Sequence, residues 1–363
     1  MKFSNKNTNF KYKIAIIPGD GIGPEVIKAS LKIIKKALSL ENIFIKEKYY
    51  PWGSKYYKKY KEMMPSNGLE KLKKHDAIFF GAVGNKHIED DITLWGLRLE
   101  ICQKLDQFAN IRPSKFLPGI ASPLKSNIAK NIDWIIVREN SEGEYAGSGG
   151  IVHEGLPLEI GSELAIFTRE GCRRIHEYAF KLALSRPKKH LTLITKSNAQ
   201  RHGMKLWDKI FYEVKEKFPT VKTDKLLVDA ATAVMVNNPE KLDVIVATNL
   251  HADILSDLAS ALSGSLGIGA TGNISAIKNF PSMFEPIHGS AFDIVGKNIA
   301  NPIGAIWSGI LMLEYLGEKK VANKIYNAIE IYAKNGGPFT PDLGGNAKTN
   351  DVIKTIFSIL DKE

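Results

Sequence analysis

Short apolar segments alternate with helix-like segments along this chain, and this alternation most constrains its fold. The first apolar segment, 13–18, precedes a helix-like stretch, 24–40, whose apolar residues recur at helical spacing: Val26, Ala29, Ile33, Ala37 and Leu40. Further apolar segments end in polar residues and lie at 133–140, 191–198 and 243–250. We expect helices after the last two, at about 201–217 and 250–262. Because parallel strands need crossover connections, the pattern predicts an α/β fold with a mainly parallel sheet covered by helices.

A glycine-rich turn, PGDGIGPEV, joins the first apolar segment to the first helix-like stretch. Its glycines are spaced G-x-G-x-G, whereas the dinucleotide-binding fingerprint reads G-x-G-x-x-G, and Pro24 stands where the third glycine would be. Proline at that point suits the first position of a helix. The residues alone leave two interpretations open: a tight strand–helix turn near an active site, and a weak dinucleotide fingerprint.

Length, charge and cysteine content narrow the classes of protein and partner. With 363 residues the chain is longer than the length at which a single hydrophobic core usually stops growing, so we expect two domains or one large α/β unit. No apolar run approaches the ~20 residues that span a bilayer, so no membrane partner is expected. The net charge of +11 comes from lysines scattered over helix-like segments, which does not favour nucleic-acid binding. Cys102 and Cys172 are too few for a disulfide framework or a zinc site, and we expect a cytoplasmic protein.

The stretch 143–168 differs from its surroundings because it is rich in glycine and alternates in polarity. This pattern predicts an antiparallel excursion. Such an excursion needs a partner to bury its apolar side, so we interpret it as a dimerisation arm.

Acidic residues in the middle of the chain favour a metal site. Asp253 and Asp257 are four residues apart and share one helical face, and Asp229 follows another apolar segment. Like charges at that spacing destabilise an isolated helix, and a divalent cation would remove the repulsion. Oxygen ligands without cysteine or histidine suit Mg²⁺ or Mn²⁺. The alternative is an exposed acidic face; His251 as a further ligand is disfavoured.

Three of the eight arginines, Arg98, Arg112 and Arg138, fall in one short window. Arginine forms bidentate pairs with carboxylates, so the cluster suits a polycarboxylate substrate, although ordinary ion pairing is the alternative for each residue. Tyr145 and Lys196 are not distinctive alone, because their ordinary pKa values are too high for proton transfer at neutral pH. A later turn-rich loop contains His288, Gly289, Ser290 and Asp293. An acid there could bind a ribose hydroxyl and favour NAD over NADP.

Together these motifs closely resemble the isocitrate/isopropylmalate dehydrogenase family of decarboxylating dehydrogenases. The segments that carry the resemblance are IPGDGIGPEV, VRENSEGEY, DILSD, HGSAFDIVGKNIANP and TPDLGGNA, and it extends over nearly the whole chain. Within the family, WGSKYYKKYKEMMP, LWG and VRENSEGEY look most like the D-malate/tartrate branch. The resemblance implies a two-domain isopropylmalate-dehydrogenase-like fold that is not a Rossmann fold. It implies an NAD-binding domain, 1–107 plus 264–363, and a substrate, metal and dimerisation domain, 108–263.

The resemblance also implies roles for individual residues in a homodimer with shared active sites. Arg112 and Arg138 would hold substrate carboxylates. Mg²⁺ or Mn²⁺ would be bound by Asp253, Asp257 and the neighbouring subunit's Asp229. Lys196, also from the neighbour, would accept the substrate hydroxyl proton, and Tyr145 would protonate the carbon left after loss of CO₂. The NAD site would be lined by His288, Gly289, Ser290, Ala291, Asp293, Asn301 and Asp342.

One departure from the family pattern bears on the substrate. The family usually places an arginine ten residues before Arg112, where this chain has Cys102. Arg98 lies one helical turn earlier, and we hypothesise that it takes over the carboxylate. A charged Arg98 fits poorly with an isopropyl group. We therefore expect NAD-dependent oxidative decarboxylation of D-malate or tartrate. The alternatives are 3-isopropylmalate dehydrogenase, less favoured isocitrate or homoisocitrate activity, and a non-catalytic regulatory subunit.

Overall fold

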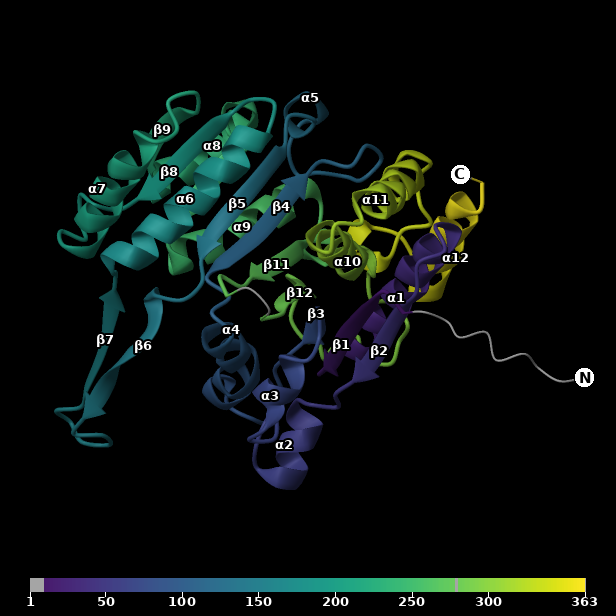
Figure 1. Cartoon of the computed structure of the whole chain (residues 1–363), viewed down its shortest axis with the longest axis horizontal. Coiled ribbons are helices and arrows are strands. Elements are labelled where there is room, and N and C mark those ends of the chain that lie inside the picture. Colours follow the sequence, from purple (N-terminus) through teal and green to yellow (C-terminus); the bar gives the residue numbers. More distant parts are fainter. Residues whose placement is uncertain (1–9, 278–279, 363) are drawn as a thin grey trace, which may run out of the picture.

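A ten-stranded sheet runs through the whole molecule, with helices on both of its faces (Figure 1). The computed structural model describes residues 10–277 and 280–362. In their spatial order the strands are β2 (Ile45–Tyr49), β1 (Tyr12–Gly19), β3 (Ala77–Ala82), β12 (Ser282–Pro286), β11 (Ala270–Ile274), β4 (Ala109–Lys115), β5 (Asp133–Glu139), β10 (Val244–Ala247), β8 (His190–Thr195) and β9 (Lys222–Leu227).

The sheet has two parallel blocks joined by an antiparallel centre. β2, β1, β3 and β12 run parallel, as do β5, β10, β8 and β9. Between the blocks, β11 is antiparallel to β12 and β4, and β4 is antiparallel to β5. The predicted α/β class with a mixed, mainly parallel sheet is therefore confirmed. The late strands β11 and β12 are inserted between β3 and β4, which are much earlier in the sequence.

Alternating side chains of the strands enter cores on opposite faces of the sheet. On β10, Val244 and Val246 pack with α6 and α7, whereas Ile245 and Ala247 pack with α8 and α9. The helices are α1 (Gly23–Leu40), α2 (Ser54–Tyr60), α3 (Gly68–Leu72), α4 (Glu100–Lys104), α5 (Ser126–Ala129), α6 (Arg169–Ser185), α7 (Gly203–Lys215), α8 (Val228–Asn237), α9 (Asn249–Ser263), α10 (Ile303–Tyr315), α11 (Lys319–Lys334) and α12 (Thr349–Leu360). Of the helices described, none is long and apolar enough to cross a membrane.

The apolar cores follow the two parallel blocks. The first block consists of β2, β1, β3 and β12. Apart from Leu117 and Ile120, the cores around it use buried residues from the beginning and the end of the chain. The cores around the second block, which consists of β5, β10, β8 and β9, use buried residues from 108–262. This partition supports a discontinuous division of the chain, although the domain boundaries stay a prediction.

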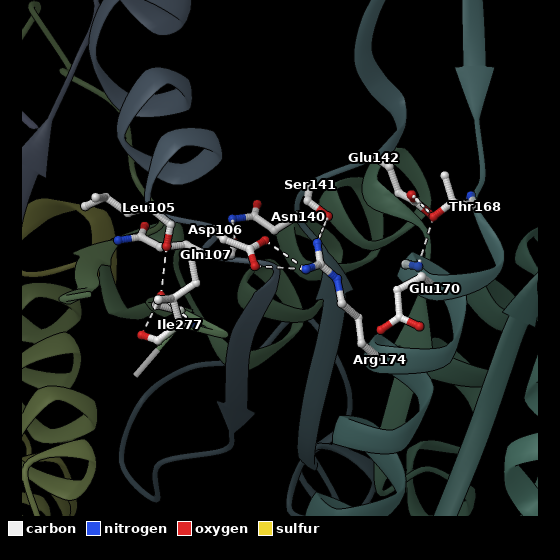
Figure 2. Close-up of polar contacts among 12 residues, drawn as sticks. Leu105, Asp106, Gln107, Asn140, Ser141, Glu142, Thr168, Glu170, Arg174 and Ile277 are labelled. Atoms are coloured by element: carbon white, nitrogen blue, oxygen red, sulfur yellow. Dashed lines mark hydrogen bonds and ion pairs between the residues drawn. The ribbon is translucent and has the colours of Figure 1, made fainter. Parts of the chain in front are cut away.

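The chain crosses between the blocks near residue 106, and a polar network holds this crossing (Figure 2). Ser275 Oγ donates to the Leu105 carbonyl at 2.8 Å, which brings the returning segment beside the outgoing one. Arg174 Nη1 contacts both Asp106 carboxylate oxygens at 2.8 and 3.0 Å, and Arg174 Nη2 donates to Ser141 Oγ at 2.7 Å. Helix α6 therefore fixes the crossing against the segment that follows β5.

The segment 143–168 forms an antiparallel arm, as predicted. Its strands β6 (Gly143–Val152) and β7 (Ile160–Ile166) pair with each other and extend away from the ten-stranded sheet (Figure 1). The arm exposes large apolar side chains, and Leu158 at its end is 74% exposed. The others are Ile151, Val152, Leu156, Ile160, Leu164 and Ile166. Exposed apolar patches of this kind mark interaction surfaces, which fits the interpretation as a dimerisation arm.

The glycine-rich turn between β1 and α1 is a close-packed turn. A Cβ atom on Gly21 would lie 1.8 Å from the carbonyl oxygen of Ser290, and one on Gly19 would lie 1.9 Å from that of Ala82. The backbone N–H of Ile22 donates to the Ser290 carbonyl at 2.9 Å. Both glycines also have positive φ, a conformation that glycine adopts without strain. The turn thus holds the loop after β12 against the first helix.

We predict that Gly21→Ala destabilises the fold more than Gly317→Ala. Gly317 also has positive φ, but no atom lies within 4 Å of its added Cβ. Alanine at Gly317 should lower the free energy of unfolding by about 1–2 kcal/mol, from backbone strain alone. At Gly21 the overlap with Ser290 should bring the total to roughly 3 kcal/mol or more. Urea unfolding followed by circular dichroism measures both, and equal losses would contradict the packing explanation.

A buried histidine lies between α6 and α7. His176 is fully buried, its ring is 4.2 Å from the Trp207 ring and 5.3 Å from the Phe211 ring, and its Nε2 lies 3.2 Å from the Trp207 carbonyl oxygen. Burial lowers the pKa of His176 to about 3, so the ring is neutral in the folded protein.

This burial predicts a stability change with pH. The folded pKa is lowered, so between about pH 6.5 and pH 3 the unfolded chain binds one proton more than the folded chain at this site. The free energy of unfolding should therefore fall as the pH falls through this window, by up to about 1.4 kcal/mol per pH unit. His176→Phe removes this contribution. Its unfolding curves, measured from pH 8 to pH 4 beside the wild type, should show a shallower acid slope; parallel slopes would refute the assignment.

Candidate active site

Three arginines that are buried or largely buried meet two carboxylates at one cavity of about 210 Å³. The cavity lies where the antiparallel centre of the sheet meets the first block. Its charged and phenolic lining residues come from six elements: Arg98 from a π-helical segment (Asp91–Leu99), Arg112 from β4, Arg138 from β5, Tyr145 from β6, Asp253 from α9 and Glu285 from β12. The sequence singled out all of these except Glu285.

Arg138 and Arg112 converge on one carboxylate. Asp253 Oδ1 accepts a hydrogen bond from Arg138 Nη1 and lies 3.2 Å from Arg112 Nη1. Burial alone would raise the pKa of Asp253, but the guanidinium groups of Arg138 and Arg112 lower it below its ordinary value. The Arg138 guanidinium also lies 5.5 Å from the centre of the Tyr145 ring. A positively charged wall is thus placed beside a phenol.

Neutral side chains orient these two guanidinium groups. Arg112 Nε donates to Asn110 Oδ1 at 2.8 Å, and Arg112 Nη1 donates to Ser256 Oγ at 2.6 Å. Arg138 Nε donates to Asn249 Oδ1 at 3.0 Å. Sequence reasoning missed these partners, because single asparagines and serines at strand and helix positions give no distinctive signal.

Arg98 enters the cavity beside Glu285. Arg98 Nε and Nη2 each lie 2.8 Å from Glu285 Oε1, and both side chains are largely buried. Burial opposes the charged form of Arg98, but the carboxylate of Glu285 raises the arginine pKa. Cys102, one turn further on, is buried, and burial raises the pKa of its thiol to about 11. It is therefore an uncharged thiol that cannot replace an arginine.

A buried amide connects the Arg98–Glu285 pair to the other arginines. Asn273 Nδ2 donates to Glu285 Oε1 at 2.8 Å, and Asn273 Oδ1 accepts from Asn110 Nδ2 at 2.6 Å. Since Asn110 also accepts from Arg112, one continuous hydrogen-bond chain runs from Arg98 to Arg112. Asn273 and Asn110 are fully buried and lie outside the described cavity lining, so this chain holds Arg98, Glu285 and Arg112 in place from the protein interior.

The three expected metal ligands are not together in one chain. Asp257 lies one turn after Asp253 on α9; burial raises the pKa of Asp257, Arg112 opposes the rise and Asp253 adds to it. Asp229, at the start of α8, instead pairs with Lys196 Nζ at 2.5 Å. Over residues 10–277 and 280–362, no group of three or more potential ligands is assembled. Lys196 and Asp229 are also absent from the described lining of the cavity.

The residues expected to bind NAD lie along the loop after β12 and near the C-terminal part of the chain. His288 and Gly289 line the cavity. Ser290 contacts the glycine-rich turn, Ala291 has a φ of 40°, and Asp293 is exposed. Asp342 is held by Ser265 Oγ at 2.6 Å and by Asn301 Nδ2 at 2.9 Å. The structure thus brings Asn301 and Asp342 together and puts His288 at the cavity.

Comparison with known proteins agrees with the geometry. Residues 13–356 match the isocitrate/isopropylmalate dehydrogenase family. The chain belongs to this family. It is 59% identical over 347 residues to a protein of Agrobacterium vitis named probable tartrate dehydrogenase/decarboxylase, covering 95% of this chain and 97% of that protein. It is 43% identical to the D-malate dehydrogenase [decarboxylating] of Escherichia coli strain K12, covering 96% and 98%.

A solved structure of the same family supports the fold. The crystal structure of isocitrate dehydrogenase from Methylococcus capsulatus aligns with a TM-score of 0.87 at 31% identity, over 96% of this chain and 99% of that chain. The family resemblance and the isopropylmalate-dehydrogenase-like fold expected from the sequence are therefore confirmed. The chain is a decarboxylating dehydrogenase of the isocitrate/isopropylmalate dehydrogenase family.

Proposed function

We propose that this enzyme catalyses the NAD-dependent oxidative decarboxylation of a small 2-hydroxy dicarboxylate of the D-malate or tartrate type. The observation that carries the proposal is the small cavity in which Arg98, Arg112 and Arg138 meet Asp253 and Tyr145. Positive charge in a cavity of this size favours a short dianion. The names of the relatives from Agrobacterium vitis and Escherichia coli support the same substrate class.

Arg112 and Arg138 are the proposed carboxylate-binding residues. Both are buried, and both are oriented by neutral partners that leave their positive charge uncompensated except by Asp253. Arginine fork geometry matches a carboxylate, and a buried guanidinium binds it more strongly than an exposed one would. Substrate and Asp253 would then share these two cations. Arg98 is a third substrate-binding residue, although Glu285 already occupies two of its nitrogens.

Mg²⁺ or Mn²⁺ fits the acidic residues of α9. Asp253 and Asp257 present two oxygen donors one turn apart, and burial keeps the pKa of Asp257 raised, so a bound cation would relieve an unfavourable negative charge. We propose Asp253 and Asp257 as ligands, with Asp229 of a second copy completing the set. When bound, the cation polarises the substrate hydroxyl and stabilises the negative charge that develops on oxygen.

Lys196 and Tyr145 are the proposed proton-transfer residues. Lys196 would accept the proton of the substrate hydroxyl, and Tyr145 would deliver a proton to carbon after CO₂ leaves. Tyr145 lines the cavity of its own chain, whereas Lys196 is paired with Asp229 away from the described lining. A second copy that brings Lys196 and Asp229 to this cavity would complete the site. The exposed apolar arm offers the surface for such a homodimer.

NAD fits the loop after β12. His288 Nε2 is buried without a hydrogen-bond partner among the described residues, so it has capacity to bind a ligand. Asp342 is an exposed acceptor held in place by Thr340 Oγ1 at 2.5 Å and by Asn301. A fixed acidic residue suits a ribose hydroxyl and repels a 2′-phosphate. We therefore propose NAD as the hydride acceptor. The residues that would bind it are His288, Gly289, Ser290, Ala291 and Asp293 of the loop, together with Asn301 and Asp342. A cytoplasmic location stays a prediction from the sequence.

Wild-type enzyme should form NADH from D-malate or tartrate in a metal-dependent reaction. Chelator-treated enzyme should be inactive and recover with Mg²⁺ or Mn²⁺. We expect kcat/KM for 3-isopropylmalate to be lower by roughly 100-fold, because its branched apolar group would desolvate the Arg98–Glu285 pair. The kcat/KM values are measured from the absorbance of NADH, with D-malate, tartrate, 3-isopropylmalate and isocitrate as substrates. Best turnover of 3-isopropylmalate, or turnover without metal, would contradict the proposal.

Mixing two inactive variants tests whether sites are shared between subunits. Lys196→Ala and Asp253→Ala should each be inactive, but a heterodimer would contain one intact site. A refolded equimolar mixture should therefore recover about a quarter of wild-type activity, because half of randomly assembled dimers are heterodimers with one working site. Asp253→Ala mixed with Asp257→Ala is the matched control, since both changes affect the same site. No recovery in the first mixture, or equal recovery in both, would refute site sharing.

A further inference from the structure

The Arg98–Glu285 pair differs from an unpaired arginine in the charge that it presents to a ligand. Glu285 Oε1 accepts from Arg98 Nε and from Asn273 Nδ2, both at 2.8 Å, and it lies 2.8 Å from Arg98 Nη2. All three known contacts of the carboxylate therefore use one oxygen. The charges of Arg98 and Glu285 compensate each other, so the pair presents a nearly neutral polar surface.

Two atoms of the pair remain available inside the cavity. Among the described residues, Arg98 Nη1 and Glu285 Oε2 have no hydrogen-bond partner. Neither atom is fully covered by the surrounding protein. Both residues line the cavity. One atom is a donor and the other an acceptor, and the contact between Arg98 and Glu285 Oε1 holds the two side chains next to each other in the cavity lining.

A neighbouring donor and acceptor match a hydroxyl group, which both donates and accepts. A second carboxylate would accept from Arg98 but would be repelled by Glu285. An apolar group would leave both atoms unpartnered. Since Arg112 and Arg138 supply the uncompensated positive charge, the substrate carboxylates have better partners than Arg98.

We propose that the Arg98–Glu285 pair binds the hydroxyl group on carbon 3 of a 2,3-dihydroxy dicarboxylate and thereby favours tartrate over D-malate. This inference rests on the proposed function, since it assigns one substrate group to the same cavity. Asn273 is the positioning residue, because it fixes the Glu285 oxygen that holds Arg98. D-Malate, which has only hydrogen on carbon 3, would fill the site without satisfying the pair.

The test is the ratio of kcat/KM for tartrate to kcat/KM for D-malate, measured with each tartrate stereoisomer. In the wild type we expect the ratio for the best stereoisomer to exceed one by on the order of 10- to 100-fold, the effect of one or two hydrogen bonds to charged groups. Glu285→Gln keeps the shape of the side chain but turns an acceptor into an amide, and it should reduce this ratio at least roughly 10-fold. D-Malate turnover in the same variant is the internal standard for general damage.

Two further variants keep the test decisive. Arg98→Lys retains a positive charge but loses the guanidinium fork, and it should also reduce the ratio, even if Glu285→Gln does not fold. Glu330→Gln makes the same chemical change in a surface carboxylate that pairs with Lys115, and it should leave the ratio unchanged. If Arg98 instead bound a carboxylate common to both substrates, both rates would fall together and the ratio would stay constant.

The outcomes separate this inference from the proposed function. A ratio that is unchanged in Arg98→Lys and in folded Glu285→Gln overturns the inference alone, provided that the wild type oxidises D-malate or tartrate. A wild-type ratio at or below one for every stereoisomer also overturns it. If the wild type forms no NADH from any of these acids, both the proposed function and the inference fail.

Discussion

The burial of three guanidinium groups around one small cavity is the constraint on which the rest of this structure depends. A buried cation is costly unless it is paired and hydrogen-bonded. Here Asp253 forms ion pairs with Arg112 and Arg138, and Glu285 forms one with Arg98. Asn110 and Asn249 complete the hydrogen bonds. The cavity is therefore built from matched polar groups, and each one needs a backbone element that delivers it to the right place.

The antiparallel centre of the sheet provides those elements. In a wholly parallel sheet the side chains of one functional edge would come from strand ends that all point in the same direction. Because β11 and β4 run against their neighbours, Asn273 and Asn110 face each other directly across a ladder, in the middle of the sheet. The buried amide chain between the arginines is thus a consequence of strand direction. Insertion of β11 and β12 between β3 and β4 is what brings the late carboxylate Glu285 to the early arginine Arg98.

The sequence was sufficient for the elements that repeat along the chain and for much of the charged lining of the cavity. Apolar periodicity predicted the sheet and its covering helices, and the glycine-rich alternating stretch predicted the antiparallel arm. The family motifs pointed to Arg112, Arg138, Tyr145 and Asp253, and the arginine cluster and a departure from the family pattern pointed to Arg98; the structure places all five around one cavity. It was insufficient for long-range partners. Glu285 lies 187 positions from Arg98 and is a single acid in an apolar segment, so no local signal links the two. The glycine-rich turn is similar: Gly21 is required by the Ser290 backbone and Gly19 by the Ala82 backbone, which local spacing cannot show.

The Arg98–Glu285 pair also separates this cavity from one made for an apolar substrate. Replacing a buried ion pair with well-packed apolar side chains is often neutral or stabilising, so stability alone does not explain a charged pair in this wall. An apolar wall would receive a branched alkyl group at no electrostatic cost, whereas this wall would leave Arg98 Nη1 and Glu285 Oε2 without hydrogen-bond partners. The pair is consistent with a ligand whose polar groups reach that wall. Arg112 and Arg138, whose charge is uncompensated except by Asp253, line the same cavity, so substrate carboxylates match these two arginines and a neutral polar group matches the pair.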